Sequence, residues 1–196
     1  MNSSSTQQSL PVPRKQLVSK NQMDEIIAQL GEQIADRYSQ QRLVMVPVLT
    51  GALRFTSELI AHLETIALEI EPVMVQSYVG TQSTEAKLNT LRLQSSQVAG
   101  SHVLIVDDIY DTGQTLWKLT EYLHTLKPAS VSHAVLLQKT GRQDPRYRLT
   151  PEFIGVNIPD EFVVGMGLDY RGFYRNLSSI SVLEDEERAF VDQLLA

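Results

Sequence analysis

The sequence predicts an α/β fold in which a parallel sheet is covered by helices on both faces. Short apolar runs without polar alternation, typical of strands buried on both faces, recur along the chain. Between them lie stretches whose apolar residues return at helical spacing, and this alternation favours parallel strands joined by helices. With 196 residues, the chain is long enough for one such domain.

The expected helices cover roughly 21–34, 53–63, 116–126 and 184–195, and the expected strands roughly 43–49, 73–75, 103–106 and 131–137. Asn21 is available to cap the first helix. Pro47 weakens the prediction of the first strand, because proline cannot donate to a ladder. Residues 80–89 are polar and predict a long loop of the kind that serves as a lid. Residues 153–182 form short apolar pieces broken by Gly, Pro and Asp.

Composition excludes several classes of function. The net charge of −6 and a pI near 5.2 argue against nucleic acid as a partner. The absence of cysteine excludes disulfides, zinc–thiolate sites, iron–sulfur clusters and thiol catalysis. No apolar run is long enough to cross a membrane, and residues 1–13 predict a disordered lead rather than a signal peptide. We therefore expect a cytoplasmic protein with no membrane partner.

The most informative segment follows the strand at 103–106. Two adjacent carboxylates, Asp107 and Asp108, come first, and a turn with Asp111 leads into a helix. Ligands of open α/β sheets bind at the carboxyl ends of strands. The free amides of Thr112–Thr115 would attract a phosphate, and Gly113 would let the backbone approach it closely. Simple capping of the helix by Asp111 and Thr112 is the structural alternative, but it does not account for three clustered carboxylates.

Other phosphate and carboxylate motifs fit less well. The sequence has no P-loop run, and Gly165 and Gly167 lack the third glycine of a dinucleotide fingerprint because Tyr170 stands there. Asp111, Thr112 and Gly113 match the Asp-Thr-Gly of aspartic proteases, which pair two such loops. One copy is present, so this interpretation requires a homodimer to supply the second.

Five segments in order along residues 43–182 resemble the hypoxanthine–guanine branch of the type I phosphoribosyltransferases. They are 48–51 (a diphosphate loop), 76–84 (a lid), 103–116 (a phosphoribosyl pyrophosphate signature), 136–139 (a purine-reading strand), and 162–170 with 174–177 (a hood). The resemblance implies a Rossmann-like parallel sheet in a single domain over 14–196. It also implies a small hood, built from about 14–30 and 150–196.

The activity implied by the resemblance is transfer of a 5-phosphoribosyl group from phosphoribosyl pyrophosphate to N9 of hypoxanthine or guanine. Diphosphate leaves, and Mg²⁺ is the implied cofactor. Relatives form homodimers or homotetramers. An alternative is a nucleotide-binding regulator of the same fold that binds RNA, although the charge of −6 speaks against a broad basic face.

The resemblance also assigns the site residues. The phosphoribosyl group and its 5-phosphate would contact Asp107, Asp108, Asp111, Thr112, Gly113, Gln114 and Thr115. The purine would contact Lys139, Phe162, Val163 and Asp169. The diphosphate would contact Thr50, Gly51 and Arg175, and the lid would carry Ser77 and Tyr78. Magnesium would be held by Asp107, Asp108 and Asp169.

Individual roles follow from the chemistry of these side chains. Asp111 would be the general base that exchanges a proton with purine N7. Lys139 only donates hydrogen bonds, so it would select a 6-oxo acceptor over the amino group of adenine. Phe162 would stack on the purine, with core packing as an equally weighted alternative. Thr50 and Gln76 stand where relatives often carry a basic residue, and the peptide bond before Thr50 is expected to be cis, as in relatives.

Overall fold

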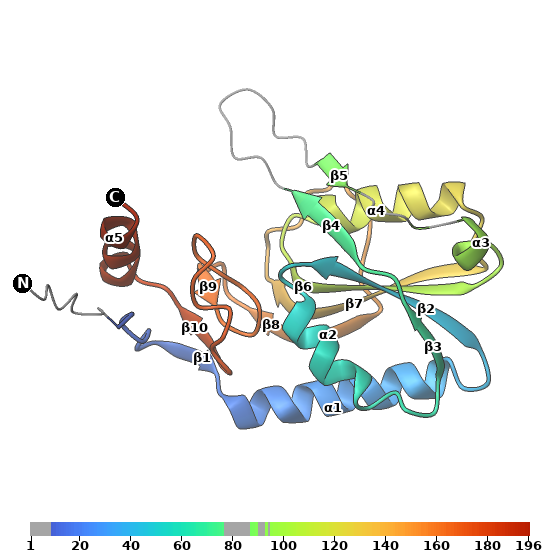
Figure 1. Cartoon of the computed structure of the whole chain (residues 1–196), viewed down its shortest axis with the longest axis horizontal. Helices are drawn as coiled ribbons and strands as arrows, with labels where there is room; N and C mark the ends of the chain where they lie inside the picture. Colours follow the sequence, from blue (N-terminus) through green and yellow to red (C-terminus); the bar gives the residue numbers. More distant parts are fainter. Residues whose placement is uncertain (1–8, 77–86, 90–92, 94) are drawn as a thin grey trace, which may run out of the picture.

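The computed structural model describes residues 9–76, 87–89, 93 and 95–196. Within these residues a seven-stranded sheet runs in the order β5-β4-β2-β6-β7-β8, with β3 also paired to β2 (Figure 1). All its pairings are parallel except that of β4 with β5. Its strands are β2 (Arg42–Leu49), β3 (Ala67–Ile70), β4 (Val73–Gln76), β5 (Lys87–Asn89), β6 (His102–Tyr110), β7 (Ser130–Lys139) and β8 (Phe153–Ile158). The predicted fold class is confirmed.

Pro47 lies inside β2, which has neighbours on both sides. On one side β2 pairs first with β3, up to Met45, and then with β4, from Val48 onward. Pro47 falls in the gap between these two partners, where proline's missing N–H costs no ladder bond on that side. The proline therefore marks the point at which β2 changes neighbours.

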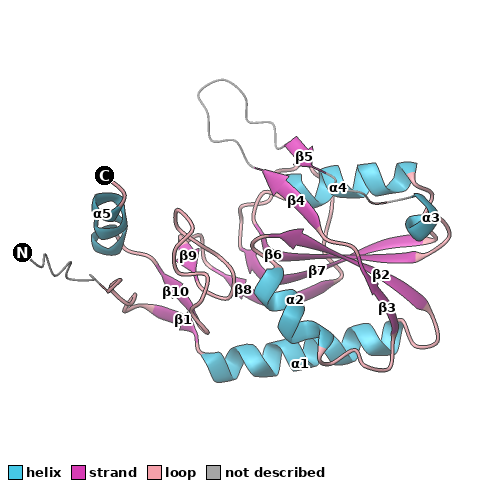
Figure 2. Cartoon of the chain, viewed as in Figure 1, coloured by secondary structure: helices cyan, strands magenta, loops and turns pink. Residues whose placement is uncertain are grey.

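Helices cover both faces of the sheet (Figure 2). They are α1 (Lys20–Arg37), α2 (Leu53–Ile60), α3 (Ser95–Val98) and α4 (Gln114–Thr125). Alternate residues of β2 divide between two cores: Leu43 packs with the cluster under α1 and α2, and Val44 with the cluster under α4.

The predicted N-cap of α1, Asn21, was wrong by two positions. Ser19, not Asn21, is the N-cap, and it forms a capping box with Gln22. The serine hydroxyl accepts from the backbone N–H three residues on, and the glutamine side chain accepts from the backbone of the cap.

A second, three-stranded sheet joins the two ends of the chain. It contains β1 (Gln16–Val18), β10 (Ile180–Val182) and β9 (Val163–Val164), in that order, and α5 (Asp185–Leu194) packs beside it (Figure 2). The hood was expected to be built from about 14–30 and 150–196. These ranges also contain the first half of α1 and all of β8, and both of these elements pack with the large sheet. No helix of the described residues is long and apolar enough to cross a membrane.

Candidate active site

Strand β6 carries the two adjacent carboxylates inside the sheet. The sequence predicted that the strand ends before Asp107, but β6 continues to Tyr110. It pairs with β2 only as far as Val106, whereas it pairs with β7 up to Tyr110. Beyond Val106 the side of β6 that faced β2 is therefore open, and the carboxylates lie at this opening.

Asp107 and Asp108 are held in a low-dielectric environment. Asp107 is 6% exposed, and its Oδ1 accepts a hydrogen bond of 3.0 Å from the Asp108 N–H. Burial raises the pKa of Asp107 well above its usual range, and the charge of Asp108 adds to the rise. Burial also raises the pKa of Asp108, although hydrogen bonds and the positive charge of Arg175 oppose the change. Two such carboxylates favour a positively charged ligand between or beside them.

The turn after β6 brings backbone amides to the start of α4. Gly113 is the N-cap of α4 and has φ 88°, in the left-handed region that glycine adopts without a Cβ penalty. The Asp111 carboxylate does not cap the helix, because its Oδ1 accepts from Arg142 Nε at 3.0 Å. The Thr112 hydroxyl accepts from the Gln114 N–H only at 3.4 Å. The amides at this turn are thus left for a ligand.

A pocket of about 470 Å³, here called the larger pocket, opens in front of this turn. It is lined by Val48, Leu49, Thr50, Gly51, Val75, the whole run from Asp107 to Leu116, Asp169 and Arg175. The structure therefore brings together all the residues predicted for the phosphoribosyl group, its 5-phosphate and the diphosphate.

The loop after β2 forms one wall of the larger pocket. The Leu49–Thr50 peptide bond is cis, as expected. A Cβ on Gly51 would lie 1.9 Å from Asp108 Oδ2, and a Cβ on Gly167 would lie 1.9 Å from the Gly51 carbonyl oxygen. Glycine is required at both positions because three segments meet there without space for a side chain.

Arg175 reaches the larger pocket from the small sheet's side of the molecule. Its Nη2 lies 2.6 Å from Asp169 Oδ1, and its Nη1 donates to the Gly167 carbonyl oxygen at 2.5 Å. Asp169 also accepts from the Gly172 N–H at 2.6 Å. These contacts hold the Arg175 guanidinium in the lining of a pocket that also contains Asp107 and Asp108.

A smaller pocket of about 210 Å³ adjoins the larger one and shares four lining residues with it. Its lining consists of Asp108, Ile109, Asp111, Lys139, Phe162, Val163, Leu168 and Asp169. All four residues predicted for the purine are therefore in one place.

Phe162 is only partly covered by protein. It is 40% exposed, its ring packs edge-on against Tyr170 at 5.8 Å, and the Arg188 guanidinium lies over the ring at 4.7 Å. Its exposure contradicts the alternative that it is a simple core residue, and leaves aromatic surface for a ligand.

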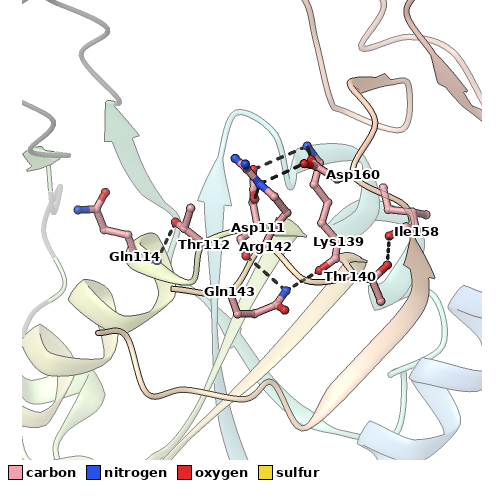
Figure 3. A network of polar contacts seen from close by, with 9 residues as sticks. All are labelled: Asp111, Thr112, Gln114, Lys139, Thr140, Arg142, Gln143, Ile158 and Asp160. Atoms are coloured by element: carbon pink, nitrogen blue, oxygen red, sulfur yellow. Dashed lines mark hydrogen bonds and ion pairs between the residues drawn. The ribbon is translucent and has the colours of Figure 1, made fainter. Parts of the chain in front are cut away.

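Four charged side chains meet at the edge of the smaller pocket (Figure 3). Lys139 Nζ lies 3.8 Å from Asp111 Oδ2 and 3.4 Å from Asp160 Oδ1. Arg142 Nε bonds Asp111 and lies 3.6 Å from Asp160. The sequence predictions missed Arg142 and Asp160. A basic residue three positions after Lys139 was the available signal, but an exposed arginine at a strand end is usually solvated surface.

Two predicted features lie beyond this geometry. Ser77 and Tyr78 of the expected lid fall outside the described residues. Among the described residues no group of three His, Cys, Asp or Glu side chains is placed to hold one metal ion. A cation here would thus have one or two carboxylates and take its other ligands from substrate and water, as Mg²⁺ commonly does.

Residues 13–171 match the phosphoribosyl transferase domain family. The hypoxanthine-guanine phosphoribosyltransferase of Streptococcus pneumoniae is 38% identical over 174 residues, which cover 88% of this chain and 94% of the relative. The chain belongs to the hypoxanthine-guanine phosphoribosyltransferase family. The Staphylococcus aureus member is 36% identical over 170 residues, covering 87% of this chain and 93% of the relative.

Solved structures of the family share the fold. A hypoxanthine phosphoribosyltransferase from Staphylococcus aureus superposes with a TM-score of 0.81 at 36% identity, covering 89% of this chain and 93% of that one. A point mutant of the Trypanosoma cruzi enzyme, complexed with the product IMP, gives 0.82 at 32% identity, covering 96% and 98%. The resemblance found in the sequence is confirmed. The protease alternative is disfavoured, because the Asp111 carboxylate is bonded to a guanidinium rather than to a second carboxyl group.

Proposed function

We propose that the protein transfers the 5-phosphoribosyl group of phosphoribosyl pyrophosphate to N9 of hypoxanthine or guanine, giving IMP or GMP and diphosphate. The observation that carries the proposal is the junction of the two pockets at Asp108, Ile109, Asp111 and Asp169. An anion-binding turn and a slot with an aromatic wall and a lysine meet there, as a reaction between a sugar phosphate and a base requires.

In this reaction the bond from ribose C1 to the diphosphate oxygen breaks, and the bond from C1 to purine N9 forms. The purine loses one proton, which Asp111 accepts at N7. Lys139 donates to the purine O6, and Phe162 covers the ring. The amides of the turn, with the hydroxyls of Thr112 and Thr115, hold the 5-phosphate.

Asp111 has to give up its contacts with cations when it faces the purine. Asp160 lies 3.6 Å from Arg142 Nε and 3.4 Å from Lys139 Nζ, so both cations keep a carboxylate nearby when Asp111 turns away. Asp160 thus continues to offset part of their positive charge during the exchange.

The residues present fit a hard divalent cation. Asp107 is buried and Asp108 half-buried, burial raises the pKa of both carboxyl groups, and Asp169 lines the same pocket. Their carboxylate oxygens are the hard ligands that such a cation prefers. We infer Mg²⁺ as the cofactor, held by Asp107 and Asp108, with Asp169 at a second ion. When bound, the ion would neutralise charge on the leaving diphosphate.

The decisive test is turnover by the purified protein with Mg²⁺, phosphoribosyl pyrophosphate and either hypoxanthine or guanine. Nucleotide and diphosphate should form in equal amounts, and adenine should react far more slowly. A folded protein that converts neither 6-oxopurine would overturn the proposal.

We infer a cytoplasmic homodimer or homotetramer. Both inferences rest on the family. Analytical ultracentrifugation should give a mass of two or four chains, and a monomer at assay concentrations would contradict the inference. The RNA-binding alternative has no feature of the described structure in its favour.

A further inference from the structure

The phosphate-binding turn is supported from behind by the segment Gln143–Leu149, here called the brace. When the N–H groups of a turn converge on an anion, its carbonyl groups point the other way and need donors of their own. The brace supplies two: the Gln143 side-chain amide donates to the Asp111 carbonyl oxygen at 3.4 Å, and the Asp144 N–H donates to that of Thr112 at 3.0 Å. Two consecutive brace residues thus bind two consecutive carbonyls of the turn.

Gln143 also holds a fixed point in the sheet. The same nitrogen, Nε2, donates to the Lys139 carbonyl oxygen at 2.5 Å (Figure 3). Lys139 closes strand β7 and is paired there with Ile158 of β8, so its backbone is anchored independently of Gln143. The Asp111 carbonyl lies in a turn beyond the end of β6. One amide group therefore ties a turn to a strand.

The rest of the brace follows the turn into α4. Tyr147 Oη accepts from Gln114 Nε2 at 2.7 Å, and the Tyr147 ring lies 5.6 Å from that of Trp117. The Tyr110 hydroxyl donates to the Leu149 carbonyl oxygen, and the Tyr110 ring packs 3.0 Å from the position of a Cβ on Gly113. The brace therefore contacts both ends of the turn.

The opposite side of the turn faces the larger pocket and is where a ligand would bind. Among the hydrogen bonds of the described residues, none uses the N–H groups of Gly113 or Thr115. Both residues line the larger pocket. Donors to the carbonyls behind the turn keep these amides aimed at the pocket before a ligand arrives, which lowers the ordering cost of binding.

We propose that Gln143 is a positioning residue that fastens the phosphate-binding turn to strand β7 and so sets the affinity for the 5-phosphate group. The proposal rests on the proposed function, since it assigns Gln143 to the same site. Gln143 itself lines neither the larger nor the smaller pocket, so its proposed role is to position the turn rather than to contact substrate.

The test compares Gln143→Met, which keeps the length of the side chain and removes the donor, with Gln33→Met on the exposed face of α1. Thermal unfolding first establishes that each variant folds. Loss of the amide should raise the KM for phosphoribosyl pyrophosphate and the Kd for IMP about five- to tenfold. The KM for hypoxanthine should change less than about twofold, and Gln33→Met should behave like the wild type.

The split between the two substrates separates positioning from general damage. Equal rises in both KM values, or values like those of Gln33→Met, would overturn the proposal. Should Gln143→Met fail to fold, Gln143→Glu replaces it, because a carboxylate of the same size also cannot donate to the two carbonyls. A wild-type protein without turnover or IMP binding would instead overturn the proposed function, which is a distinguishable result.

Discussion

The two pockets of the site share four lining residues, but the rest of each lining comes from different parts of the chain. Most of the residues that line the larger pocket come from the end of β2 with the loop after it and from one unbroken run, Asp107 to Leu116, and Val75, Asp169 and Arg175 join them from other segments. The residues that line the smaller pocket come from β6 and the turn after it, from β7 and from the segment 162–169, and its aromatic residue, Phe162, is 40% exposed. The proposed 5-phosphate site is therefore contained in one continuous segment, whereas the proposed base site depends on how distant segments are packed.

Asp111 belongs to both pockets, so its replacement should have the largest effect. Asp111→Asn keeps the shape and removes the proton acceptor, and we expect kcat to fall by about 10²–10⁴. Asp160→Asn, which alters the same charge cluster without touching the turn, is the matched control and should cost far less. Steady-state kinetics measure both, and near-normal turnover by Asp111→Asn would show that another group takes the proton.

Gly51→Ala should act mainly on the larger pocket, which Gly51 lines, although Asp108 borders both pockets. The added Cβ would meet Asp108 Oδ2 at 1.9 Å and displace either the carboxylate or the loop. A shift of this size should lower kcat/KM for phosphoribosyl pyrophosphate by about 10². Gly100→Ala is the control: its φ of 70° costs some stability, but nothing lies near its Cβ. Equal kinetics for the two variants would contradict the proposed contact.

Lys139→Ala should break the smaller pocket alone. Losing a charged donor to the purine oxygen should reduce the preference for hypoxanthine over adenine by about 10- to 100-fold. Lys20→Ala, on the exposed surface of α1, should leave the preference unchanged. The ratio of kcat/KM values for the two bases is the measurement. A larger change in KM for phosphoribosyl pyrophosphate than in this ratio would place Lys139 elsewhere.

The smallest effect concerns stability and belongs to the larger pocket. Burial, followed by the charge of Asp108, raises the pKa of Asp107, so the folded chain holds this proton to a higher pH than the unfolded chain does. The resulting stability is full below the unfolded pKa and is lost as pH rises through the folded pKa. At neutral pH, Asp107→Asn should therefore raise the Tm by about 2–4 °C while impairing turnover.

Thermal unfolding from about pH 5 to about pH 8 tests this sign. The Tm gap between Asp107→Asn and the wild type should widen as pH rises, and Mg²⁺ should narrow it by stabilising the wild type. Asp36→Asn, at an exposed position of α1, serves as the control. A lower Tm for Asp107→Asn at the alkaline end of this range would contradict the effect of burial.

Much of the difference between the two pockets can be predicted from the sequence. The strand, the carboxylates and the start of α4 lie in one continuous run, residues 103–116, and local physics of buried strands, glycine and helix ends is enough to predict an anion site there. The end of β6 was misplaced because the sequence pattern changes at Asp107, while pairing with β7 continues to Tyr110. Asp107 is tolerated inside β6 because the pairing of β6 with β2 ends at Val106.

The alternation of strands and helices and the turn expected to bind phosphate could be predicted from the sequence, because each depends on residues close together in the chain. The family could be predicted because five separate segments keep their order along the chain. Three groups of contacts became visible only in the folded chain. Arg142 and Asp160 lie beside Asp111 and Lys139, the Gly51 carbonyl oxygen leaves no space for a Cβ on Gly167, and Gln143 donates to two backbone carbonyls. Those contacts come from segments whose separation along the chain carries no periodic signal. Their partners are selected by the packing of the hood and the brace against the sheet, which no local pattern specifies.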